Sequence, residues 1–154
     1  MVEEDEYRST YHAVVRRRCV FEKAILTHRC ACACSTRFYL ADREGISCQS
    51  QRTHQRCAGF LVLLRENARF ALGITAVAPE LPHAKEIKVQ VGGLLGLQKA
   101  MDAQAADMPT VDDIYRLTNA AMGHYVSLAD LPYEEIMQSI VVFKGREKRP
   151  RPEK

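Results

Sequence analysis

The sequence predicts a mainly α-helical, single-domain protein: a bundle of four or five helices with a cysteine-rich N-terminal segment and at most a short strand. Three observations lead to this expectation. Apolar residues recur at helical spacing in several segments, helix-capping residues stand at their starts, and only one short segment alternates as a strand does. A chain of 154 residues is also long enough for one domain with a buried core.

Five helices are expected from this pattern. Ser9 and Thr10 can cap the first, Gly73 suits the end of the second, and Thr110 suits the start of the fourth. Pro132 stands just inside the start of the last helix, where proline is tolerated. The expected helices cover residues 9–26, 48–72, 94–106, 110–122 and 130–143.

Between the second and third helices, residues 86–91 read Glu-Ile-Lys-Val-Gln-Val. This alternation predicts one short strand, because successive side chains of a strand point to opposite faces. Gly92 and Gly93 then read as a turn with glycines that pack against a following helix. A second turn is expected at residues 42–45, Asp-Arg-Glu-Gly.

The charge is distributed unevenly along the chain. Residues 1–57 hold ten basic and seven acidic side chains, and residues 58–143 hold six basic and ten acidic ones. Residues 144–154 hold six basic and two acidic side chains together with two prolines. We therefore expect a globular domain over residues 1–143 and a basic, disordered tail over 144–154, which could also dock on an acidic partner or nucleic acid.

The most informative feature is the distribution of cysteine. All six cysteines lie within residues 19–57, which form the cysteine-rich part of the domain. Such clustering indicates a shared role in metal binding, disulfide bonding or thiol redox chemistry. Cys19 lies on a helical apolar stripe and is expected to pack in the core. The candidate ligands are Cys30, Cys32, Cys34, Cys48 and Cys57.

The local conformation decides which of these sulfurs act together. An extended chain places His28, Cys30, Cys32 and Cys34 on one face, because they are two residues apart. A helix places only Cys30 and Cys34 on one face. The sequence leaves both conformations open.

An iron–sulfur cluster is the cofactor that this pattern favours. Iron–sulfur clusters take four thiolates at varied spacings, whereas structural zinc sites use two short Cys-x2–4-Cys pairs, of which only Cys30 and Cys34 form one. Zinc binding by an interaction module and a metal-free thiol-redox protein stay as alternatives. A further alternative is that the cysteines fill small buried positions.

The remaining expectations concern location and partners. The acidic N-terminal residues and the lack of a long apolar run predict a cytoplasmic protein without a membrane span, in a compartment that keeps thiols reduced. No catalytic constellation stands out, so enzymatic activity stays open, and we expect a protein acting in electron transfer, redox sensing or stability of an assembly. A protein or redox partner follows from that role.

Overall fold

The computed structural model describes residues 17–74 and 81–144. These residues form five α-helices, two short 3-10 helices and one antiparallel sheet of two strands. In chain order the elements are α2 (Glu22–Leu26), β1 (Ser35–Leu40), β2 (Arg43–Cys48), α3 (Gln51–Ala71), α4 (His83–Met101), η1 (Ala103–Ala105), α5 (Ile114–His124), η2 (Leu128–Asp130) and α6 (Tyr133–Val142). The predicted mainly helical fold is confirmed.

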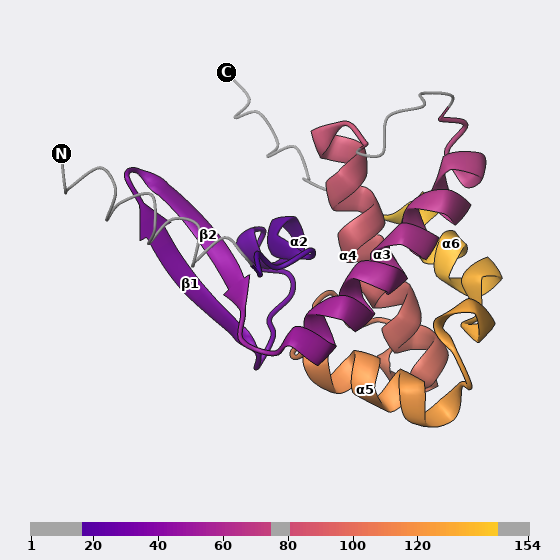
Figure 1. Ribbon diagram of the computed structural model, residues 1–154. Helices are drawn as coiled ribbons and strands as arrows, with labels where there is room; N and C mark the ends of the chain where they lie inside the picture. The colour runs from indigo at the N-terminus through magenta and orange to yellow at the C-terminus, as the bar shows by residue number, and fades with distance from the viewer. Residues whose placement is uncertain (1–16, 75–80, 145–154) are drawn as a thin grey trace, which may run out of the picture.

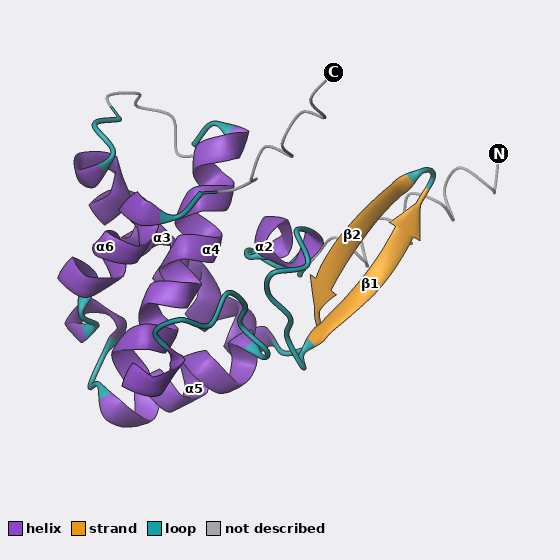
Figure 2. Cartoon of the chain, turned by 180° about the vertical axis from the view of Figure 1, so that it is seen from behind, coloured by secondary structure: helices purple, strands orange, loops and turns teal. Residues whose placement is uncertain are grey.

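The four longer helices, α3 to α6, pack into one body, and the β1–β2 hairpin projects from it beside the short helix α2 (Figures 1 and 2). The core is formed by fully buried side chains from several elements: Phe21, Ile46, Phe60, Leu64, Leu94, Leu97, Ile114, Ile136 and Ile140. Within the described ranges, 17–74 and 81–144, no helix combines the length and hydrophobicity that a membrane span requires.

Helix α4 packs closely against α6 through glycines. A Cβ at Gly92 would lie 2.8 Å from the Cα of Ile140, and a Cβ at Gly96 would lie 2.9 Å from the Cα of Ile136. Only glycine allows two helix backbones to approach this closely. These glycines therefore pack helices together, as predicted, but the predicted turn at Gly92-Gly93 is wrong because both lie inside α4.

The predicted strand over residues 86–91 is also wrong, since the whole segment lies in α4. Its alternation reflects burial on more than one side of the helix. Val89 and Val91 are buried against the core, and the polar side chains of Glu86 and Gln90 are buried as well. The two strands lie earlier, β1 in the stretch whose conformation the sequence left open and β2 over residues predicted as a turn (42–45) and a helix start (48).

The other helix boundaries agree with expectation to within a few residues. Ser50 caps α3, its side-chain oxygen accepting from the Thr53 N–H, and Gly73 adopts the left-handed conformation after the last turn. Helix α5 starts later than predicted, because Asp113 rather than Thr110 caps it. Helix α6 starts at Tyr133, three residues later than predicted, with Pro132 at the position before its first residue rather than inside it.

The expected first helix is present only at its C-terminal end, in α2. Residues 9–16 lie outside the described residues, and residues 17–21 are not helical. Instead, Arg18 pairs with Ser47 of β2, and the backbone N–H of Cys19 donates to the Ile46 carbonyl at 2.8 Å. This segment therefore lies along β2 and brings Cys19 beside the end of the hairpin.

The hairpin turns at Ala41 and Asp42, not over the whole of residues 42–45. Ala41 has a positive φ of 55°, the left-handed conformation that tight turns need. Phe38 of β1 stands opposite Gly45 of β2, and a Cβ at Gly45 would meet the Phe38 ring. The missing side chain of Gly45 leaves the space that this ring occupies.

Candidate metal centre

Four of the six cysteines, near the junction of the hairpin and the helical body, are close enough for their sulfurs to influence one another's pKa. The pKa of Cys57 is raised by burial first and then by the nearby sulfurs of Cys19, Cys32 and Cys48. Cys32 and Cys48 likewise raise the pKa of Cys19. We call Cys19, Cys32, Cys48 and Cys57 the cysteine cluster.

Each member comes from a different stretch of backbone. Cys19 lies in the extended segment paired with β2, and Cys48 is the last residue of β2. Cys32 lies in the loop before β1, and Cys57 lies in the second turn of α3. Folding therefore brings closer sulfurs whose consecutive members are separated by 8 to 15 residues in the sequence.

The loop that carries Cys32 is held by α5 and the segment before it. Ala31 N–H donates to the Val111 carbonyl at 3.0 Å, and Ala33 N–H donates to the Asp113 carboxylate at 2.9 Å. Because Asp113 also caps α5, the same carboxylate fixes both the loop and the helix start.

Burial favours the protonated form of three of these thiols in the metal-free chain. It raises the pKa of Cys19 and of Cys57 to about 12, and it also raises the pKa of Cys32. A buried thiolate without a neighbouring cation loses its hydration, so the neutral form is favoured. A bound metal would reverse this preference, because metal ligation requires the thiolate.

Backbone amides already point at two of the sulfurs. The N–H of Phe21 hydrogen-bonds the Cys19 sulfur, and the N–H groups of Cys34 and Tyr115 hydrogen-bond the Cys32 sulfur; each bond lowers the pKa of its thiol. Donors of this kind stabilise negative charge on sulfur. They are second only to burial in their effect on these two thiols.

Positive charge also lies near one member of the cluster. Arg56 lowers the pKa of the neighbouring Cys57, although burial dominates there. The first turn of α3 contains no acidic residue, so its positive end is not neutralised within the helix. Cys48, two residues before the Ser50 cap, donates its S–H to the Ser50 carbonyl at 3.3 Å.

The structure places the five cysteines predicted as ligands in different surroundings. Cys32, Cys48 and Cys57 lie in the cysteine cluster, and Cys34 is an electrostatic neighbour of Cys32. Cys30 is buried beside Val111, and the influences on its pKa are burial, that backbone contact and Arg29. The expectation that Cys19 packs against the core holds, but it also lies among the sulfurs.

The sequence did not predict that Cys19 lies near the other cysteines. The apolar stripe around it predicted a helix, whereas Cys19 lies in an extended segment. A single sequence carries little signal for the pairing of residues 17–19 with residues 46–48. The two histidines near the cluster have other surroundings: His54 Nε2 lies 3.0 Å from the Arg18 carbonyl, and His28 adopts a positive φ of 64°.

Among the residues that the structure describes, no three cysteine, histidine, aspartate or glutamate side chains surround one point closely enough to hold a single metal ion. The thiols of the cysteine cluster influence one another's pKa without forming such a group. A comparison of the chain with family models, with curated proteins and with solved structures finds no match. The function is therefore inferred from the cysteines themselves.

Proposed function

We propose that the protein is an iron–sulfur protein whose cluster is held by Cys19, Cys32, Cys48 and Cys57. The observation that carries this proposal is the meeting of four thiols from four backbone segments, with N–H groups directed at two of them. Iron–sulfur clusters take four thiolates, and hydrogen bonds to their sulfurs tune the reduction potential.

An iron–sulfur cluster places a weaker demand on the positions of the four sulfurs than a single zinc ion does. With Zn–S distances near 2.3 Å, tetrahedral zinc draws its four sulfurs to roughly 3.8 Å from one another. The described sulfurs are not gathered around one point in this way. An iron–sulfur cluster attaches its thiolates to several iron atoms and so accommodates a wider arrangement.

Electron transfer, redox sensing or stabilisation of an assembly are the roles that fit such a site. The cluster would be partly shielded, since Cys57 is buried and Cys19, Cys32 and Cys48 are half-buried. A redox role requires a protein partner that exchanges electrons with the site. We also propose a cytoplasmic location, because all six cysteines are free thiols and a reducing compartment preserves them.

Anaerobic purification and reconstitution with iron and sulfide test this proposal. The wild-type chain should acquire brown colour, broad visible absorbance and stoichiometric iron and sulfide. Cys19→Ser should lose most of this absorbance, because it removes one ligand. Cys30→Ala is the matched control, since Cys30 is buried outside the cysteine cluster, and it should retain the cluster.

Two results would overturn the assignment. One is a reconstituted wild-type chain without iron and sulfide. The other is a Cys19→Ser variant that binds as much iron as the wild type while Cys30→Ala does not. Circular dichroism of each variant before reconstitution separates loss of a ligand from loss of the fold.

The second candidate is an interaction module stabilised by zinc, since the same four thiols could close around one ion. Aerobic preparations would then retain one zinc ion per chain and remain colourless. A nucleophilic thiol-redox function receives less support, because reactive cysteines have lowered pKa values, whereas burial raises those of Cys19, Cys32 and Cys57.

A further inference from the structure

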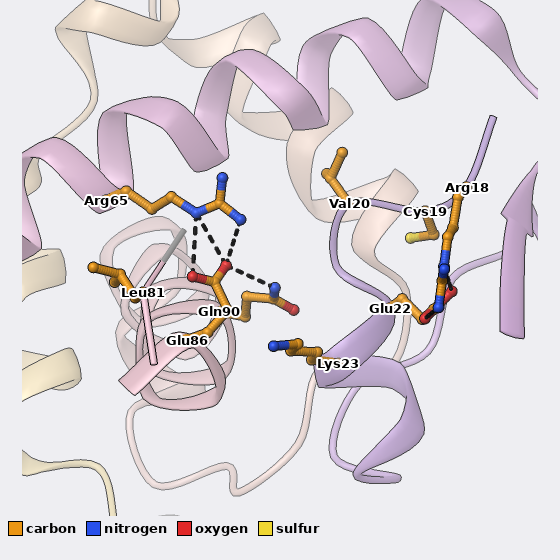
Figure 3. A pocket seen from close by; sticks show the side chains of 9 residues that line it. All are labelled: Arg18, Cys19, Val20, Glu22, Lys23, Arg65, Leu81, Glu86 and Gln90. Atoms are coloured by element: carbon orange, nitrogen blue, oxygen red, sulfur yellow. Dashed lines mark hydrogen bonds and ion pairs between the residues drawn. The ribbon is translucent and has the colours of Figure 1, made fainter. Parts of the chain in front are cut away.

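A pocket of about 330 Å³ opens between α2, α3 and α4, next to the cysteine cluster. Figure 3 shows the side chains that surround it. Cys19 lines the pocket and also belongs to the cluster, so a molecule bound here would lie beside a sulfur.

Most of the charge in the pocket is already paired. Arg65 forms a bidentate ion pair with Glu86, whose carboxylate also accepts from the Gln90 side chain at 3.0 Å. Arg18 pairs with Glu22, which also accepts from the backbone N–H of Ile46. Both carboxylates are thus occupied by donors from the protein.

Lys23 is the cation of the pocket that forms no ion pair with the described residues. The lining contains three cationic side chains, of Arg18, Lys23 and Arg65, and two anionic ones, of Glu22 and Glu86, an excess of one positive charge. Figure 3 shows the Lys23 ammonium directed toward Gln90 and Glu86. Its charge helps to hold the pKa of Glu86 below the ordinary value against the effect of burial, but no ion pair to Lys23 is formed by the described residues.

The rest of the wall is apolar. Leu81 is buried and Val20 is half-buried, and both line the same pocket as Lys23. A ligand that matches this wall has one negative charge and a short hydrocarbon part.

We propose that this pocket binds a small monocarboxylate, with its carboxylate on the Lys23 ammonium and its hydrocarbon part against Val20 and Leu81. A charge-assisted hydrogen bond to Lys23 gives the pocket its preference for anions. Burial of the hydrocarbon part gives it a preference for longer acids over acetate. The side chains that would hold the ligand, of Lys23, Val20 and Leu81, are not members of the cysteine cluster.

NMR titration of the ¹⁵N-labelled full chain tests the proposal, with sodium acetate, butyrate, phosphate and chloride as probes at constant ionic strength. Butyrate should cause saturable shifts in the Ala24 amide and the Gln90 side-chain amide, which lie at the pocket. Each added CH₂ should tighten binding by roughly fourfold relative to acetate.

Lys23→Gln should weaken butyrate binding by roughly tenfold or more, because the charged partner is lost. Lys23→Arg should largely restore binding. Lys99→Gln, an equal change of charge at an exposed position near the end of α4, is the matched control and should bind as the wild type does.

Three outcomes would overturn the proposal. Equal shifts with chloride would identify an effect of ionic strength, and equal affinity for phosphate would exclude a carboxylate-specific site. Unchanged butyrate binding by Lys23→Gln would remove the proposed anchor. A spectrum of Lys23→Gln as well dispersed as that of the wild type ensures that weaker binding is not a consequence of unfolding.

Discussion

Gly96 is the residue where the packing of the helical body tolerates least change. A Cβ there would lie 2.9 Å from the Cα of Ile136 and 3.0 Å from its carbonyl oxygen, and backbone atoms cannot move aside as a flexible side chain can. We therefore expect Gly96→Ala to lower the free energy of unfolding by about 1–3 kcal/mol, measured by urea denaturation.

Gly123 supplies the control for this prediction. It lies in α5 with no atom within 4 Å of an added Cβ. Gly123→Ala should leave stability unchanged or raise it by up to about 1 kcal/mol, because alanine favours the helix. Equal effects of the two substitutions would contradict the close contact between α4 and α6.

Single residues also show where the sequence was sufficient and where it was not. The concentration of cysteine was visible in the sequence and led to the region of the cluster. The membership of Cys19 was not visible, because it depends on backbone pairing with Ile46, 27 positions downstream. Cys30 looked equivalent to Cys32, yet the pairing of Cys30 with Val111 turns it toward a separate buried position.

At the scale of elements, α3 connects the cysteine cluster to the helical core. Its first turn follows Cys48 directly, and the Ser50 side chain accepts from the Thr53 N–H at 3.2 Å. Ser50→Ala leaves that N–H without its cap, and we expect a loss of about 1 kcal/mol in the free energy of unfolding, measured by urea denaturation.

Ser127 is a suitable comparison, since it precedes η2 but makes no capping bond to the backbone and is exposed. Ser127→Ala should change stability by less than about 0.5 kcal/mol. If Ser50→Ala is equally harmless, the start of α3 does not depend on this cap.

The error in predicting α4 has a physical cause. Buried residues of a surface helix recur every three or four positions, but α4 is buried almost continuously from Val89 to Leu94. Glu86 and Gln90 add polar residues to the buried side because Arg65 and the Ala24 N–H supply their partners. The apolar residues of α4 therefore do not repeat every three or four positions. The short alternation of apolar and polar residues at 86–91 then resembles the pattern of a strand.

At the scale of the whole molecule, basic and acidic side chains are concentrated in different parts of the chain. Residues 17–57, with the hairpin and the whole cysteine cluster, hold eight basic and three acidic side chains. Residues 81–144, with α4 to α6, hold five basic and eight acidic ones. The basic part offsets the negative charge that four metal-bound thiolates would carry, which is consistent with the proposed site.

The buried thiols make the stability of the metal-free chain depend on alkaline pH. Folding raises the pKa of Cys30 and of Cys57 from 9.0 to about 12, chiefly through burial. Below pH 9 both the folded and unfolded chains keep these protons. Between pH 9 and 12 only the unfolded chain loses them, so stability should fall, by roughly 1 kcal/mol per pH unit for each thiol.

Urea denaturation from pH 7 to 11, with a metal chelator and reductant present, measures this dependence. Stability should be flat up to about pH 9 and then decline, and Cys57→Ala should decline less steeply because one titrating thiol is removed. Cys19 and Tyr133, whose pKa values burial raises to about 12, add losses of the same sign in both chains. A wild-type curve that stays flat or rises above pH 9 would show that these thiols titrate alike in the folded and unfolded states.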